Sequence, residues 1–359
     1  MSFEISKKGL DYGKEIAILR NPGQWGLLAL LLAFLVLLPS ILSWTANINW
    51  LTFINITLIT VIAVVGLNII TGMAGQVSMG HVAFVMVGAY TTGVLVKGLG
   101  WPFWGALPVA AFITAVVGTI VGAPSLRLRG FYLAVATLAF FPIAEYIIRN
   151  LEITGKTAGL MGLTPPYIGA LSINNDTAWY YLILVIALLF IFFSLNLTRS
   201  RLGRAFFAVR DNEATAASLG ILAFSTKLRA FFIGSLFAGV AGGLLAGYMT
   251  VVRLDQFNMW DSIWYLGMIV IGGAGSTAGA VMGVIFLRVI SQILHLFSMS
   301  NLVPSINNNT WVFITSGVYG LAIVLFVSFQ PYGLLGLWKR LRLKIKFWPG
   351  GHLRAVKPC

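Results

Sequence analysis

Two glycine-interrupted apolar segments hold the residues whose types and spacing could bind a small polar molecule. The first contains Gly72, Gly75, Gln76, Ser78 and His81, and the second contains Gly272, Gly273, Gly275 and Ser276. Backbone that leaves the helix inside a membrane is tolerated only where it is buried in protein or lines a watery cavity. Paired broken helices mark the substrate path of many transporters, and free N–H groups at the start of a half-helix can bind a carboxylate. We therefore predict that these residues line a translocation path at mid-membrane.

A structural role stays open for the same polar side chains. A packed helix kink would also hold Gln76, Ser78 and His81, with their polar groups bonded to neighbouring backbone. A single histidine in a membrane helix is a weak signal of function.

The sequence contains no residue set typical of an enzyme. Cysteine occurs once, at position 359, histidine occurs three times, and only ten residues are acidic. Neither a metal site nor a nucleophile–base–carboxylate set is therefore indicated. Gly155-Lys156-Thr157 resembles the end of a phosphate-binding loop, but Asn150 stands where that motif requires glycine. We expect no catalytic residue, no ATP site and no cofactor in this chain.

The elements that position these residues must be membrane helices. Hydrophobic residues make up 58% of the 359 positions and charged residues 9%, whereas soluble proteins average about 25% charged residues. The net charge of +14 would suggest nucleic acid in a soluble protein. Here the basic residues lie in a few inter-helical segments, which is typical of cytoplasmic loops near anionic lipid. We predict an integral membrane protein that contacts lipid and no nucleic acid.

The apolar runs predict an all-α, polytopic membrane helical bundle. A spanning helix needs about 20 apolar residues. Such runs cover 25–44, 51–70, 103–123, 131–149, 179–197, 228–250 and 311–329, and the glycine-broken segments are 66–97 and 261–297. Small residues at four-residue spacing, such as Gly239, Gly243 and Gly247, predict closely packed helices.

The positions of lysine and arginine predict the orientation. Both tails and the connections near 127–129 and 199–229 are basic and are expected in the cytoplasm. The segment 261–297 must then begin and end outside, either as two short passes or as a re-entrant hairpin. We expect about ten passes within a transmembrane domain over 25–330, between cytoplasmic tails over 1–24 and 331–359.

The cytoplasmic connection over 199–229 predicts a docking surface. Helical spacing runs from Gly203 to Val209, Asp211 or Asn212 can cap a second short helix, and Gly220 can end it. Topology or lipid binding alone would explain the arginines but does not require two capped helices.

We also expect an apolar patch on this connection. Phe206 and Phe207 are expected to be exposed near the membrane, and the alanines after Glu213 leave a smooth surface. An exposed apolar patch flanked by charges is typical of a docking site.

The residues of this connection resemble those of a known family. The pattern Glu213-Ala214…Gly220 is similar to the ATPase-coupling loop of ABC importer permeases. More specifically, the chain resembles the LivM-type permeases of branched-chain amino acid importers. Four blocks in family order carry the resemblance, over 66–81, 126–132, 203–221 and 271–276.

The resemblance implies a multi-subunit importer in the bacterial inner membrane, with this chain as the translocation path for Leu, Ile and Val. Its partners would be a LivH-like second permease, two cytoplasmic ATPase subunits and a periplasmic substrate-binding protein. The expected ATPase-coupling residues are Arg204, Phe207, Arg210, Asp211, Glu213, Ala214 and Gly220.

Three alternatives stay open. Permeases for urea and short amides share much of the same pattern. A secondary transporter or channel would need ionisable groups inside the membrane, and Glu145, Arg149 and Arg288 form no clear relay. An enzyme acting on lipid would need an acid–base set that the sequence lacks.

Overall fold

The computed structural model describes residues 22–42, 50–125, 131–168, 171–173, 175–299, 308–329 and 333–337. Most of both basic tails, and the arginines at 127 and 129, lie outside the described residues.

The described elements are almost all helical, which confirms the predicted fold class. The helices are α2 (Pro22–Leu42), α3 (Trp50–Leu67), α4 (His81–Gly93), α5 (Phe103–Ser125), α6 (Phe131–Asn150), α7 (Asp176–Arg199), α8 (Arg201–Asp211), α9 (Glu213–Ser218), α10 (Ala223–Met249), α11 (Met259–Gly272), α12 (Thr277–Met299) and α13 (Asn308–Phe329). Two π-helical segments, η1 (Asn68–Met73) and η2 (Val94–Gly98), extend α3 and α4, and η3 (Lys156–Ala158) and η4 (Leu254–Gln256) are 3₁₀ turns.

Four two-residue strands form two small antiparallel pairs. β1 (Leu160–Met161) pairs with β4 (Val251–Val252), with Leu160 opposite Val252. β2 (Tyr167–Ile168) pairs with β3 (Leu171–Ser172). The first pair ties the connection after α6 to the C-terminal end of α10.

Long apolar helices in the described ranges provide the candidate membrane spans. Seven helical spans in the described part of the chain are long and apolar enough to cross a membrane, where we expected about ten passes. The glycine patch does separate two helices in 261–297, but α11 has only 14 residues. At 1.5 Å per residue it extends about 21 Å, short of the roughly 30 Å of a hydrocarbon core. This segment therefore contains one short helix, α11, and one full-length helix, α12.

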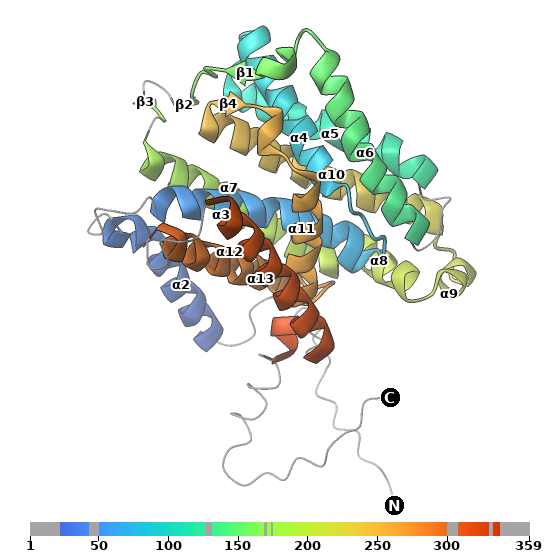
Figure 1. The fold of residues 1–359 in the computed structure, drawn as a ribbon. Coiled ribbons are helices and arrows are strands. Elements are labelled where there is room, and N and C mark those ends of the chain that lie inside the picture. Colours follow the sequence, from blue (N-terminus) through green and yellow to red (C-terminus); the bar gives the residue numbers. More distant parts are fainter. Residues whose placement is uncertain are drawn as a thin grey trace, which may run out of the picture. The chain divides into compact units, whose positions relative to one another are not determined.

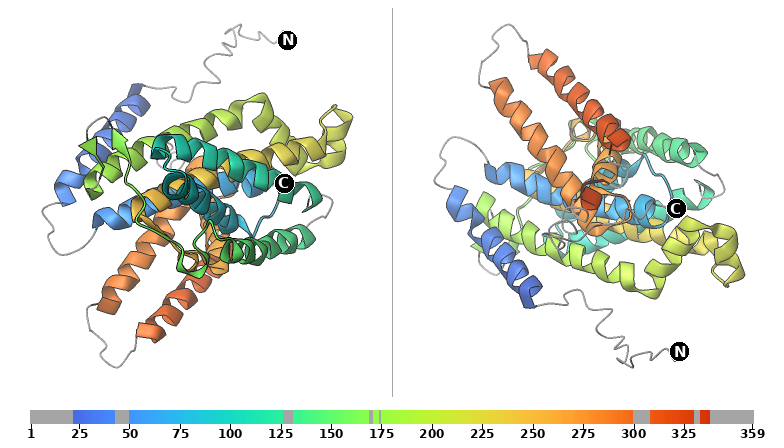
Figure 2. Two further views of the ribbon diagram at one scale, coloured as in Figure 1. Left: turned by 90° about the horizontal axis from the view of Figure 1, so that it is seen from above. Right: turned by 90° about the horizontal axis from the view of Figure 1, so that it is seen from below.

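The chain divides into two compact units, Met1–Thr52 and Phe53–Cys359. The first contains α2, which is apolar on all sides, as expected for a helix in a membrane. In the second, α10 packs against α4 and α5, and α11 packs against α12 (Figure 1). Figure 2 shows α8 and α9 at one end of α7 and α10.

Glycines allow these helices to approach closely, as their spacing predicted. A Cβ atom on Gly88 of α4 would lie 2.6 Å from the Cα atom of Gly239 on α10. A Cβ atom on Gly242 would lie 2.0 Å from the carbonyl oxygen of Val85. Because backbone stands on both sides, neither contact can be relieved by turning a side chain.

The α4–α10 contact yields a stability prediction. Gly242→Ala should destabilise the protein by about 1–3 kcal/mol, because its methyl group forces two packed backbones apart. Thermal denaturation in detergent, followed by size-exclusion chromatography, measures the loss. Gly105→Ala is the matched control, since its Cβ atom meets nothing closer than 3.8 Å. Equal midpoints for the two variants would contradict the packing argument.

Candidate functional site: the coupling segment and the glycine breaks

The coupling segment, defined here as residues 199–222, contains α8 and α9. The Ser200 hydroxyl accepts a hydrogen bond from the Gly203 N–H at 3.1 Å and caps α8. The Asn212 side chain caps α9 by accepting from Ala214 N–H at 2.9 Å and Thr215 N–H at 3.0 Å. Gly220, at φ +80°, lies just beyond α9. The two predicted helices are confirmed, and Asn212 is the cap of the second.

The exposed face of this segment differs from the prediction. Phe206 was expected to be exposed, but it is fully buried, and Phe207 packs partly against the core. The prediction was wrong because Gly203, Phe206 and Val209, spaced three apart, form the buried face of α8. The exposed large apolar side chains are instead Leu219 and Leu222.

The remaining predicted coupling residues lie at the surface. Arg204 is exposed and donates to the carbonyl of Arg199 at 2.8 Å. In α9 only Ala216 is buried, so Ala214 and the residues around it present a smooth exposed face. Asp211, the last residue of α8, is exposed.

Arg210 connects α8 to both glycine breaks. Its guanidinium donates a hydrogen bond to the carbonyl of Gly72. A Cβ atom on Gly75 (φ +70°) would lie 2.9 Å from Arg210 Cγ, and one on Gly275 (φ +87°) would lie 2.5 Å from its Nη1. Glycine is favoured at both positions for two reasons. The backbone there is left-handed, and a side chain would collide with Arg210.

The two breaks also contact each other. The side-chain oxygen of Asn68 accepts a hydrogen bond from the Gly275 N–H at 2.9 Å. A Cβ atom on Gly72 would lie 2.4 Å from the same nitrogen. The residues predicted as two related segments therefore meet in one place, beneath α8.

The mid-membrane depth that the sequence predicts for the breaks stays a prediction. The breaks lie beside α8 and near the N-terminal end of α10. The π-helical turns of η1 continue α3 as a single 24-residue span to Met73 before the chain leaves the helix. Such π-helical insertions often occur at functional sites.

The polar side chains of the first break bond mainly to nearby backbone. Gln76 is buried and donates to the Ala74 carbonyl at 3.0 Å. One ring nitrogen of the fully buried His81 bonds to the Ala63 carbonyl at 2.9 Å. Ser78 is buried, and its hydroxyl has no partner among the described residues. The contacts of Gln76 and His81 fit the structural interpretation that the sequence left open.

The residues of the second break also contact mainly their own helices, α11 and α12. The Ser276 hydroxyl accepts from the Gly279 N–H at 3.3 Å, at the start of α12. A Cβ atom on Gly272 would lie 1.9 Å from the Gly279 carbonyl oxygen, so α11 and α12 pack backbone to backbone. Gly273 ends α11 at φ +110°.

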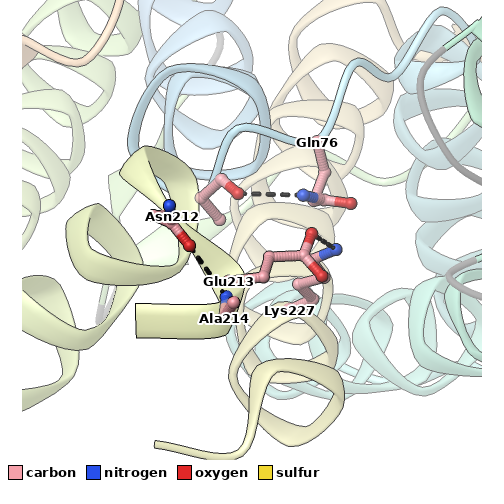
Figure 3. Close-up of polar contacts among 6 residues, drawn as sticks. Gln76, Asn212, Glu213, Ala214 and Lys227 are labelled. Atoms are coloured by element: carbon pink, nitrogen blue, oxygen red, sulfur yellow. Dashed lines mark hydrogen bonds and ion pairs between the residues drawn. The ribbon is translucent and has the colours of Figure 1, made fainter. Parts of the chain in front are cut away.

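Glu213 fixes α9 to α10 through an ion pair. Its carboxylate accepts a hydrogen bond from the ammonium group of Lys227. The Lys227 side chain is 7% exposed and that of Glu213 45% exposed. Figure 3 shows this pair together with the Asn212 cap and Gln76. A buried ammonium group requires such a partner.

A second cluster of polar side chains lines a cavity that was not predicted as a site from the sequence. A cavity of about 480 Å³ between α3, α4, α10, α11 and α12 is lined by Asp261, Arg288 and Thr60, among other residues. None of the predicted path residues lines this cavity. The sequence offered two signals for this cavity. Arg288 lies within an apolar run, and Asp261 lies at the start of the second glycine-broken segment.

The Glu213–Lys227 pair yields a double-mutant prediction. Glu213→Gln leaves the buried Lys227 without its carboxylate, and Lys227→Met removes the buried charge. Because Glu213 is partly exposed, we expect a coupling energy of about 1 kcal/mol, with the double variant more stable than the sum of the single variants predicts. Thermal midpoints of the four proteins measure it. The exposed Glu152–Lys156 pair serves as the control, for which no coupling is expected. Additive midpoints at Glu213 and Lys227 would refute the pairing.

Comparison with known proteins gives the family. The branched-chain amino acid transport system / permease component family matches residues 49–327. The high-affinity branched-chain amino acid transport system permease proteins LivM of Salmonella typhimurium and Escherichia coli are each 31% identical over 81% of this chain and 71% of their own length. A probable LivM of Methanocaldococcus jannaschii is 25% identical over 75% of this chain and 88% of its own. No solved structure matches. The chain is thus a multi-pass membrane protein that belongs to the branched-chain amino acid permease family.

Proposed function

We propose that this chain is the permease subunit of an ATP-binding-cassette importer for leucine, isoleucine and valine in the bacterial inner membrane. Family membership and the relatives named for branched-chain amino acid transport support the substrate class. In this proposal a second, LivH-like permease completes the path, two ATPases supply energy, and a periplasmic binding protein delivers the amino acid.

The contact of Arg210 with both glycine breaks is the observation that carries this proposal. ATPases that dock on the coupling segment move α8 when they bind and hydrolyse ATP. Because Arg210 is hydrogen-bonded to Gly72 and packed against Gly75 and Gly275, that movement is transmitted to the ends of α3 and α11. A self-sufficient transporter has no need for a surface segment built into the bundle in this way.

The exposed chemistry of the coupling segment supports its role in docking. Leu219 and Leu222 are 73% and 77% exposed and stand beside the small residues of α9. An apolar patch of this kind next to charged groups is typical of a protein-binding surface. The proposal places it in the cytoplasm, together with both chain termini, as the positive-inside pattern predicts.

In this proposal the glycine breaks lie on the translocation path and form its gate at the cytoplasmic end. The backbones of Gly72 and Gly275 lie close together, so a small shift of α8 opens or closes the gap between the two segments. Discrete rearrangements of this kind are how packed interfaces respond to small movements.

Uptake by the reconstituted importer tests the proposal. The chain should copurify with two ATPase subunits and a second permease. Proteoliposomes holding this complex and the binding protein should then import labelled leucine only with ATP. Unlabelled isoleucine and valine should compete, and urea and arginine should not.

A complex whose ATPases cannot hydrolyse ATP is the control. Competition by urea in place of isoleucine would transfer the chain to the urea and short-amide permeases. Uphill uptake by the purified chain alone, driven by an ion gradient, would overturn the proposal.

A further inference from the structure

The cavity between α3, α4, α10, α11 and α12 lies far from the coupling segment. It is lined by Ala241, Leu245 and Met249, which occupy one face of the C-terminal half of α10. The coupling segment joins the N-terminal end of the same helix. Its volume of about 480 Å³ is within the 300–1,000 Å³ typical of small-molecule sites.

The cavity walls are mainly apolar. Aliphatic and aromatic side chains from five helices and from the connection before α11 face it. They include Ile56, Ile59, Val85, Phe257, Met268 and Leu287. Such walls suit the side chain of an aliphatic ligand.

Two opposite charges interrupt these walls. Arg288 of α12 donates one hydrogen bond, to the hydroxyl of Thr60, and its Nε has no partner among the described residues. Asp261 of α11 accepts a hydrogen bond from the Asn258 N–H at 3.2 Å. No ion pair between Asp261 and Arg288 is found in the described part of the chain, although both line one cavity.

This arrangement is costly without a ligand. A charged side chain inside a membrane bundle is expensive and commonly marks a substrate path. Asp261 and Arg288 line one cavity without forming an ion pair, and the Arg288 Nε has no partner among the described residues. A molecule that carries a carboxylate and an ammonium group at one end and an aliphatic group at the other would complement all three parts of the cavity.

We propose that this cavity is a transit binding site for a zwitterionic amino acid with an aliphatic side chain. The Arg288 guanidinium binds the carboxylate, because its planar set of N–H donors matches a carboxylate in a bidentate arrangement. Asp261 binds the ammonium group, and the apolar walls take the side chain. The proposal rests on the proposed function and deepens it by placing the substrate at residues that the sequence pattern did not assign.

The same chemistry explains selection against other solutes. Urea carries neither charge, so it would offer no opposite charge to Asp261 or Arg288. A cationic amino acid has a second positive charge, and Asp261 is the only carboxylate among the residues that line the cavity. Unpaired buried groups are what give polar sites their strong discrimination.

Protection of an engineered cysteine tests occupancy directly. Ser291 lines the cavity, and the sole native cysteine is Cys359. The full chain with Cys359→Ser and Ser291→Cys, placed in proteoliposomes without partners or binding protein, is treated with methyl methanethiosulfonate. Leucine should slow modification of the new cysteine. Thr157→Cys, on an exposed turn outside the cavity, should be modified at the same rate with and without leucine.

Leucine analogues test the two charges without altering them. Leucinamide lacks the carboxylate and 4-methylpentanoate lacks the ammonium group, so each should need about a ten- to hundredfold higher concentration to protect. Arg288→Gln and Asp261→Asn should weaken protection by leucine to a similar extent. Arg149→Gln, which removes an exposed arginine outside the cavity, should leave protection unchanged.

The outcomes separate this inference from the proposed function. If the assembled importer carries leucine but leucine does not protect the cysteine at 291, the cavity is not the transit site and the function stands. Equal protection by leucine and both analogues would also overturn the inference, even if Arg288→Gln failed to fold. Protection by leucine in a chain whose importer carries no leucine would support the cavity and refute the function.

Discussion

The arrangement of the whole site depends on one contact, in which the Arg210 side chain fits against backbone that carries no side chains. Its guanidinium reaches the Gly72 carbonyl only because Gly75 and Gly275 leave room for it. Both of those glycines adopt a left-handed backbone conformation. The close fit joins a surface helix to two interruptions in the bundle, so none of the three can move far without the others.

The short helix α11 connects this contact to the cavity. Asp261 in its first turn lines the cavity, and its last residue, Gly272, stands beside the break that Arg210 touches. The helix α10, with 27 residues and a length of about 40 Å, runs from the coupling segment to the cavity. Its glycines pack closely against α4 and α5, and we propose that it is the fixed support against which α11 shifts. A movement of α8 thereby has a short mechanical route to the groups that we propose bind the substrate.

Local features of this site could be predicted from the sequence, whereas its long-range contacts could not. Asn212 and Gly220 predict the ends of α9, because capping depends only on neighbouring residues. The glycine patches likewise predicted where the membrane helices are interrupted. In contrast, Arg210 and Gly72 are 138 positions apart, and no spacing rule brings them together. Which of Phe206 and Phe207 faces inward depended on how α8 packs. Asp261 and Arg288 line one cavity because α11 and α12 pack against each other. Their separation in the sequence does not predict this.

The number of ATP molecules hydrolysed per leucine imported tests the central claim most directly. In the reconstituted importer, Arg210→Met should retain ATP hydrolysis but lose most leucine uptake, because the ATPases still dock while α8 no longer moves the breaks. The ratio should therefore rise at least about tenfold, a loss of coupling that corresponds to one charge-assisted hydrogen bond. Arg149→Met, which removes an exposed arginine outside the coupling segment, should keep the wild-type ratio. A wild-type ratio in the Arg210→Met importer would contradict the account.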